Sequence, residues 1–357
     1  MQSKKLLCGA LVAVMLISGV GSAPAGTVSA NRFPFQIEAQ AAQKATGINV
    51  AYHSKKQIRD YIKKHPATLS DKITYKKKPV TSGNYAPGQI SAKTGKSALN
   101  MLNQVRYIAG ISADVKLNNQ YMKLTQAASL LNYANNELSH FPAKPKNMSN
   151  AMYELGADGA SSSNIAWSSR SGWSLNDAII NAWMEDGDDY NIDRIGHRRW
   201  LLNPYMAETG FGVVDGSNGT YSTVYAFDTG NANASEYGVC WPAQNMPVEY
   251  FGADFPWSVS TGVAENPSKV KVTLTNLSTK KTWNFSAQKA NGDFYINNDG
   301  YGQKGCIIFR PSGVTGYANG DSYEVKISGL TNGPVCYKVN FFRDCPKVCV
   351  NLQIDVR

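Results

Sequence analysis

The chain has 357 residues, of which 43% are hydrophobic and 17% are charged. This composition excludes a wholly disordered chain, a collagen and a coiled coil, and the length predicts two domains with additional segments. The formal net charge of +10 is concentrated near the N-terminus, because residues 31–93 carry twelve Lys and Arg against three Asp and Glu. Residues 94–357 carry 22 against 23. We therefore expect no nucleic-acid partner for this nearly neutral remainder.

Residues 1–30 have the layout of a secretory signal peptide. Lys4 and Lys5 precede an apolar run over about residues 6–20, and small residues follow as far as Ala30. The run is shorter than the ~20 residues that cross a bilayer, so a retained membrane anchor is the less favoured alternative. We predict an exported protein that is secreted and, in one interpretation, associated with the cell wall.

Cysteine usage agrees with export but does not define a disulfide pattern. Apart from Cys8 in the signal peptide, the chain has five cysteines, at positions Cys240, Cys306, Cys336, Cys345 and Cys349. Five cannot all pair within one chain, and the spacing selects no pairing. Zinc is the less favoured interpretation of the C-terminal group, because it contains no Cys-x-x-Cys and no nearby histidine.

A basic segment follows the signal peptide over residues 31–94. Proline and glycine interrupt it, and only residues 55–64 show helical spacing, with few apolar positions. We interpret this segment as a leader or linker. It is either a solvated spacer or an electrostatic tether to an anionic cell-wall polymer or membrane surface, which salt would weaken.

Residues 95–257 change from helical to strand patterns. Apolar spacing predicts a helix from Ser97 that Gly110 caps, a second helix from about Tyr121 to 138, and a third that Ser174 caps. Alternating patterns then predict strands over about 210–214 and 221–227. Helices followed by strands favour a compact α+β domain.

Residues 258–357 lack helical periodicity. Short alternating segments at 270–274, 323–327 and 336–342 are separated by glycine and asparagine clusters. This spacing predicts a small all-β, immunoglobulin-like sandwich. No catalytic constellation is visible within it.

Two of the four histidines have chemically suggestive neighbours. His140 is expected to end the second helix, and His197 follows a group of acids that includes Glu185 and Asp186. Two imidazoles with nearby carboxylates can bind a divalent cation or transfer protons if the fold brings them together. Periodicity does not show that it does, so two unrelated structural histidines remain an alternative.

A succession of short motifs resembles a bacterial member of the CAP superfamily, which includes cysteine-rich secretory proteins, insect venom antigens and plant pathogenesis-related proteins. The motifs are Leu102-Asn103-x-x-Arg106 with Ala109-Gly110, then His140, Ser163-Asn164-Ile165-Ala166, Ala182-Trp183-Met184 and Gly196-His197-Arg198. The resemblance covers about residues 95–257. It implies an α-β-α sandwich with an open cleft.

The resemblance also implies a set of cleft residues. His140 and His197 correspond to the two family histidines, and Asp186 corresponds to one of two family acids, with Glu185 adjacent to it. The position of the other acid, which precedes Asn164, is occupied by Ser163, so one carboxylate is missing.

These observations lead to three hypotheses. The preferred one is an exported binding module in which His140 and His197 line one cleft for a divalent cation, such as zinc, or for a small ligand or peptide. The second is a secreted, peptidase-like hydrolase with His140, His197, Asp186 and Glu185 as candidate catalytic residues. A triad through Ser163 is less favoured, because this serine lacks a Gly-x-Ser-x-Gly context and the run Ser161-Ser162-Ser163 indicates a loop. The third is a structural component of a cell wall or spore coat.

Overall fold

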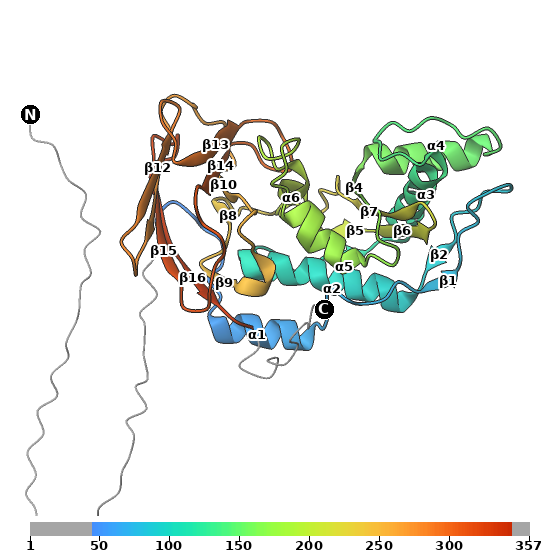
Figure 1. The fold of residues 1–357 in the computed structure, drawn as a ribbon, viewed down its shortest axis with the longest axis horizontal. Helices are drawn as coiled ribbons and strands as arrows, with labels where there is room; N and C mark the ends of the chain where they lie inside the picture. The colour runs from blue at the N-terminus through green and yellow to red at the C-terminus, as the bar shows by residue number, and fades with distance from the viewer. Residues whose placement is uncertain (1–44, 345–357) are drawn as a thin grey trace, which may run out of the picture. The chain divides into compact units, whose positions relative to one another are not determined.

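The computed structural model describes residues 45–344, and the signal peptide predicted for residues 1–30 lies outside this range. Along the described chain, a helix-rich half precedes a strand-rich half (Figure 1). This arrangement confirms the predicted α+β class. Within residues 45–344, no helix is both long enough and apolar enough to cross a bilayer.

An antiparallel sheet forms the middle layer of the helix-rich half. Its strands lie in the order β4-β7-β6, formed by Ser163–Ser168, Gly219–Tyr225 and Phe211–Gly216. On one face, α3 (Asn119–Asn135) packs against β6 and β7, and α4 (Asn150–Ser161) packs on α3. The α3–β6 approach is close, because a Cβ atom on Gly212 would lie 2.2 Å from the carbonyl oxygen of Thr125.

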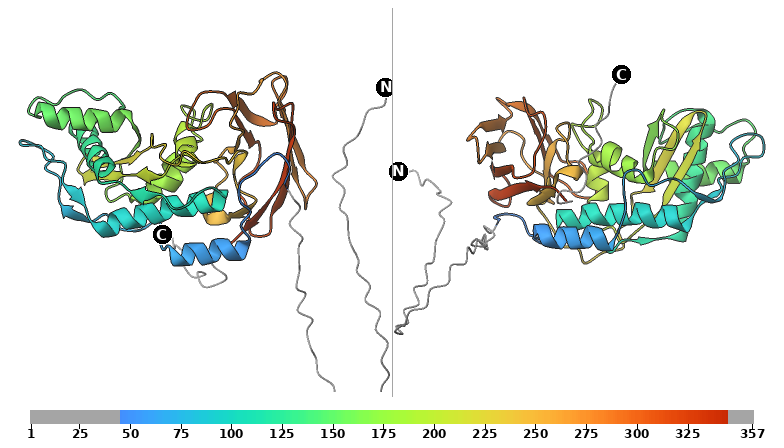
Figure 2. Two further views of the ribbon diagram at one scale, coloured as in Figure 1. Left: turned by 180° about the vertical axis from the view of Figure 1, so that it is seen from behind. Right: turned by 60° about the horizontal axis from the view of Figure 1, so that its bottom comes forward.

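The other face of the sheet carries a second helical layer. α5 (Leu175–Ala178) continues directly into the π-helix η1 (Ile179–Met184), which packs against β4. α2 (Ala92–Ala109) packs in turn against α5 and η1 (Figure 2). The Trp183 indole donates a 3.1 Å hydrogen bond to the Ile165 carbonyl and so joins η1 to β4. These layers form the expected α-β-α sandwich.

Local sequence signals locate two helix ends correctly. α2 ends at Gly110, whose φ of 77° is the left-handed conformation that glycine adopts without steric cost. The side chain of Ser174 accepts a 3.0 Å hydrogen bond from the Asp177 N–H and caps α5. The sequence did not predict α4, because its glycines weaken the helical signal. Gly159 nevertheless permits close contact between α4 and α3, since a Cβ atom at this position would lie 2.2 Å from the Leu124 carbonyl oxygen.

Two facing sheets form the strand-rich half. The four-stranded sheet has the order β13-β14-β10-β8, with strands Gly292–Asn297, Cys306–Pro311, Trp257–Ser260 and Val239–Trp241. The five-stranded sheet has the order β12-β11-β15-β16-β9, with strands Thr282–Ser286, Lys271–Asn276, Ser322–Ser328, Val335–Phe342 and Asn245–Pro247. Of these strand pairs only β9–β16 is parallel. A 3-10 turn, η2 (Val248–Tyr250), follows β9.

Aromatic side chains fill the space between the two sheets. Trp257 of β10 is fully buried, and its ring lies 5.5 Å from Tyr323 of β15 and 6.2 Å from Phe341 of β16, measured between centroids. The sandwich begins earlier than predicted, since β8 and β9 precede residue 258. Cys240 and Cys306 are buried free thiols, and burial raises the pKa of Cys240 to about 12; Cys345 and Cys349 lie outside the described residues.

The basic segment is not a solvated leader from residue 45 onward. Its predicted helix is present as α1 (Lys55–Lys64), and Ile58 on this helix is 1% exposed. Two rings of this segment stack on the Tyr107 ring of α2: the His53 ring at 3.7 Å and the Tyr61 ring at 3.9 Å, measured between centroids. Two short strands, β1 (Tyr75–Lys77) and β2 (Gln89–Ile90), complete the segment. The helix has few apolar residues of its own, and aromatic stacking with α2 supplements them.

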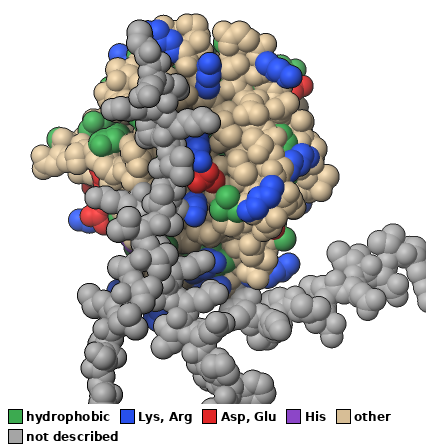
Figure 3. Space-filling model, turned by 90° about the vertical axis from the view of Figure 1, so that its left-hand side faces the viewer, with side chains coloured by type: hydrophobic (Ala, Val, Ile, Leu, Met, Phe, Trp, Pro, Cys, Tyr) green, Lys and Arg blue, Asp and Glu red, His purple; other side chains and the backbone are tan. Residues whose placement is uncertain are grey.

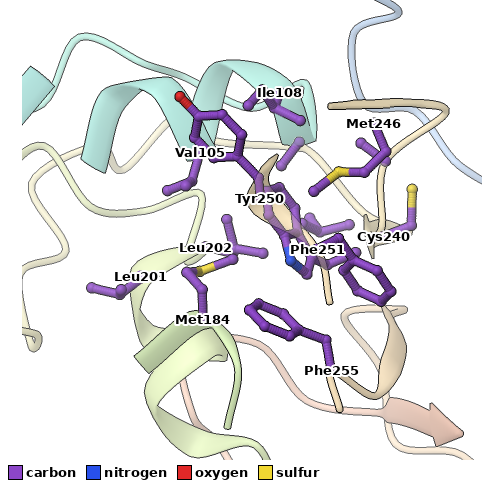
Figure 4. Close-up of a cluster of buried hydrophobic side chains, with 14 of the residues drawn as sticks. Val105, Ile108, Met184, Leu201, Leu202, Cys240, Met246, Tyr250, Phe251 and Phe255 are labelled. Atoms are coloured by element: carbon purple, nitrogen blue, oxygen red, sulfur yellow. The ribbon is translucent and has the colours of Figure 1, made fainter. Parts of the chain in front are cut away.

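One hydrophobic core is continuous through both halves. It contains residues of α2, η1, the short helix that follows η1, the segment 239–257 and both sheets of the sandwich. Figure 4 shows the centre of this core, where Val105, Met184 and Leu202 surround Tyr250 and Phe251. The Tyr250 hydroxyl donates a 2.7 Å hydrogen bond to the Gln104 side chain. The helical half and the sandwich are therefore packed together rather than joined by a free linker.

Candidate functional site

A histidine and a carboxylate form the most distinctive polar pair of the helical half. His197 lies on α6 (Gly196–Leu201), and Asp186 follows the end of η1. The imidazole Nδ1–H donates a 2.8 Å hydrogen bond to Oδ1 of Asp186. The His197 side chain is 22% exposed and the Asp186 side chain is 0% exposed. Because Nδ1 is hydrogen-bonded to Asp186, the ring nitrogen of His197 that can bind another group is Nε2.

Local backbone geometry brings these two residues together. Asp186 and Ile195 have φ values of 48° and 42°, in the left-handed region, and they lie at the two ends of the loop between η1 and α6. Gly196 then starts α6 where a Cβ atom would lie 2.9 Å from carbons of the Tyr301 ring. Gly196 therefore allows α6 to pack closely against the β13–β14 loop, and His197, the next residue, contacts Asp186.

Two opposing effects act on the pKa of His197. Burial favours the neutral imidazole and would lower the pKa, but the negative charge and hydrogen bond of Asp186 more than offset this effect. The pKa of His197 therefore lies above its ordinary value. The imidazolium form is stabilised toward neutral pH, and it carries an Nε2–H donor.

The next residue, Arg198, holds the site to the sandwich. Its guanidinium is fully buried and donates to the carbonyl oxygens of Met184, Glu185 and Pro256 and to the Ser258 hydroxyl, at distances of 2.5–3.2 Å. Its backbone N–H donates to Oδ2 of Asp186 at 3.2 Å. Burial lowers the pKa of Arg198 to about 10, so the side chain stays cationic at neutral pH.

Arg199 reaches the sandwich on a separate path. Its guanidinium donates to the Asn297 side chain and to the carbonyl oxygens of Asp299 and Gln303, and it lies 5.0 Å from the centroid of the Tyr301 ring. These groups belong to β13 and the loop that follows it. Arg198 and Arg199 thus join α6 to two different parts of the sandwich, whereas His197 on the same helix pairs with Asp186.

Strand β4 supplies the neighbours of α6. The Asn164 amide is buried and donates a 2.9 Å hydrogen bond to the His197 carbonyl oxygen. Ser163, which the sequence places in a loop, is instead the first residue of β4. Its hydroxyl is buried and has no hydrogen-bond partner within residues 45–344. The Ser163–His–Asp186 triad is therefore not formed.

His140 lies elsewhere than predicted along the chain. α3 ends at Asn135, so His140 is in the loop that follows the helix rather than at its last residue. Its Nδ1–H donates a 2.8 Å hydrogen bond to the Ala160 carbonyl oxygen, near the end of α4. In the described part of the chain, no hydrogen bond or ring contact joins His140 to His197. That both histidines line one cleft stays a prediction.

Glu185 does not replace Asp186 in the pair. Its side chain makes no hydrogen bond with His197, whereas its backbone carbonyl accepts from Arg198. Burial raises the pKa of Glu185, Arg198 opposes this shift, and the nearby acids Asp188 and Asp186 add to it. Of the two acids that the sequence left open, Asp186 is the one that contacts the imidazole.

The residues present do not fit a resident divalent cation. Across residues 45–344, no three His, Cys, Asp or Glu side chains group closely enough to hold a metal ion. Both Asp186 oxygens already accept hydrogen bonds, from His197 and from the Arg198 backbone. Zinc sites in proteins use three or four such ligands. The chemistry of the site is that of an imidazole–carboxylate pair.

Comparison with known families agrees with this architecture. Residues 99–229 match the family model of the cysteine-rich secretory protein family, CAP. The match extends from α2 to just beyond β7 and includes His140, Ser163, Asp186 and His197. No curated protein matches the chain. Residues 99–229 therefore correspond to a CAP domain.

Proposed function

We propose that this protein is an extracellular binding module whose CAP domain takes a small ligand or peptide at the Asp186–His197 pair. The hydrogen bond between these two side chains carries the proposal, because it fixes the ring orientation and leaves Nε2 as the available nitrogen. A protonated imidazole offers a donor and a positive charge. The ligand group at this point is therefore an anion or a strong hydrogen-bond acceptor, such as a peptide carboxylate.

The hydrolase alternative has weaker support. An imidazole held by a carboxylate can act as a general base, but a nucleophile or positioned water must lie within hydrogen-bond reach of it. The Ser163 hydroxyl makes no hydrogen bond to His197. Cleavage of a peptide is therefore an outcome to be tested and is not the preferred activity.

Replacing His197 with glutamine is expected to weaken peptide binding about tenfold, because one charge-assisted hydrogen bond contributes about 1.4 kcal/mol. The measurement is retention of the purified chain on an array of short peptides with free C-terminal carboxylates. His65→Gln is the matched control, since His65 makes its own hydrogen bond to Tyr61 on α1, outside the site. Equal retention of both variants and the parent chain would remove His197 from the binding site. Peptide cleavage that is lost in His197→Gln alone would favour the hydrolase.

We also propose that basic side chains hold the protein near an anionic envelope polymer. Lys76, Lys77 and Lys78 are exposed at β1. Figure 3 shows that Lys and Arg side chains, with fewer Asp and Glu, are also scattered over the sandwich end of the molecule, which is the end opposite to β1 in Figure 1. Such exposed charges attract a polyanion through a field that salt screens within about 10 Å at 0.1 M.

Replacing Lys76, Lys77 and Lys78 together by glutamine is expected to reduce co-sedimentation with anionic cell-wall polymer several-fold at low salt, and to have little effect at 0.5 M salt, where the same attraction is already screened. The experiment compares this variant with the parent chain across a salt series. Lys144→Gln with Lys146→Gln, in the loop before α4, is the control for charge alone. Retention that is independent of both salt and these lysines would contradict the tether.

A further inference from the structure

A cavity with both apolar and polar lining residues lies outside the Asp186–His197 site. Its volume is about 330 Å³, and it is lined by three segments that are far apart in the sequence: residues 70–74, the first two turns of α2, and the first turn of α5. The volume is at the lower end of the range for small-molecule sites, which is about 300–1,000 Å³. Residues 70–74 belong to the basic segment, so the packing of that segment onto the CAP domain creates the cavity.

Asn176 in the cavity lining has an unsatisfied acceptor. This residue is 1% exposed, and its amide nitrogen donates to the Thr68 carbonyl at 2.7 Å, to the Ser97 hydroxyl at 2.8 Å and to the Asp71 carboxylate at 3.2 Å. Because a carbonyl and a carboxylate can only accept, they fix which end of the amide is nitrogen. The other end, Oδ1, has no partner among the described residues. An unpaired buried acceptor is costly, so a donor is expected there.

The charge at the cavity comes from one acid and two lysines. Asp71 accepts hydrogen bonds from Thr68 and Ser97 as well as from Asn176. Burial opposes ionisation of Asp71, but these hydrogen bonds and the charge of Lys93 outweigh it and lower its pKa. Asp71 is thus ionised, and its carboxylate oxygens already accept hydrogen bonds from groups of the protein. Lys72 and Lys93 are exposed at the rim, and no ion pair engages either of them in the described structure.

We propose that this cavity binds a monosaccharide-sized, hydroxyl-bearing ligand with one anionic group, a sugar acid or a sugar phosphate. A ligand hydroxyl donates to Oδ1 of Asn176. The anionic group lies at the rim between Lys72 and Lys93, whose two charges exceed that of Asp71. Ile73 and Leu175 supply the apolar part of the lining, against which the ring carbons pack. The site is separate from the proposed peptide site and does not depend on it.

Saturation-transfer NMR and calorimetry on the purified chain test this site with four probes: glucuronate, glucose 6-phosphate, glucose and acetate. Glucuronate or glucose 6-phosphate is expected to bind more tightly than glucose, which lacks the anion, and than acetate, which lacks the hydroxyls. The double variant Lys72→Gln and Lys93→Gln is expected to weaken binding of the anionic sugars about tenfold through the loss of two ion pairs. Preference for one of the two anionic sugars identifies the anion.

Three further variants distinguish the proposed contacts from general effects. Lys96→Gln on the same helix is the matched control, because Lys96 is exposed and does not line the cavity. Asn176→Ala is expected to weaken every hydroxyl-bearing probe about tenfold, whereas Asn181→Ala retains the parent affinity. Circular dichroism checks that each variant folds. Absence of binding by all four probes, or unchanged binding in the double lysine variant, overturns the proposal; unchanged binding in folded Asn176→Ala also overturns it and assigns the missing donor to water.

Discussion

Replacing Arg198 with methionine is expected to lower the free energy of unfolding by about 3–5 kcal/mol, as removal of one member of a buried charged network does. Methionine fills much of the same space but donates no hydrogen bond. The carbonyl oxygens of Met184, Glu185 and Pro256 would each lose a donor inside the protein. Urea unfolding followed by circular dichroism measures the change.

The size of this effect tests whether the CAP domain and the sandwich depend on each other. Arg198 is the residue whose hydrogen bonds join η1 to the start of β10. Arg170→Met is the control, because Arg170 is largely exposed and its ion pair with Asp177 is at the surface; surface pairs contribute about 0–1 kcal/mol. If Arg198→Met were no more destabilising than this control, the interface between the two halves would not require the arginine.

Local chemistry explains the parts of the fold that the sequence predicts well. Gly110 ends α2 because it adopts the left-handed conformation that this helix end requires, and Ser174 starts α5 because its side chain accepts a hydrogen bond from a backbone N–H of the first turn. The alternating pattern of β11 and β15 likewise follows from one buried and one exposed face. Such features need no knowledge of distant residues.

Features that depend on distant partners were missed or placed incorrectly. The basic segment has too few apolar residues to predict burial. Its packing relies on Tyr107, 54 positions after His53 in the sequence: the Tyr107 carbonyl accepts a hydrogen bond from the His53 ring, and the two rings stack. Ser163 lies in a run of serines that indicates a loop, but pairing with Tyr225 of β7 makes it a strand residue. β8 and β9 join the sandwich through pairing with β10 and β16, which follow later in the chain.

The candidate site was predicted in part, and through resemblance more than periodicity. Motif order identified His197 and Asp186, which contact each other. It did not reveal that Arg198 and Arg199 anchor α6 to the sandwich, because the carbonyl groups that they contact have no sequence signature. The same limitation applies to Asn176, whose amide partners come from residues 68–71 and 97.

Replacing Asp186 with asparagine is expected to lower the pKa of His197 below its ordinary value and to change its tautomer. The asparagine backbone tolerates the φ of 48° at this position. Its oxygen can accept from the Arg198 N–H, so its NH₂ group faces Nδ1, which must then be unprotonated. Nitrogen-15 NMR of the imidazole across pH measures both the pKa and the position of the proton.

The same substitution predicts a pH-dependent loss of stability. In the parent chain the pKa of His197 is raised by folding, so the stabilisation that the pair provides is fully present below the unfolded pKa of about 6.5 and is lost as pH rises through the folded pKa. Asp186→Asn should therefore cost about 1.5–3 kcal/mol at pH 5, as loss of a charge-assisted hydrogen bond does, and less at high pH. Asp193→Asn, an exposed carboxylate in the same loop, should show no such dependence. A penalty that is equal at pH 5 and pH 9 would mean that Asp186 orients the ring without stabilising its charge, and the ligand at Nε2 would then meet a neutral imidazole rather than a cation.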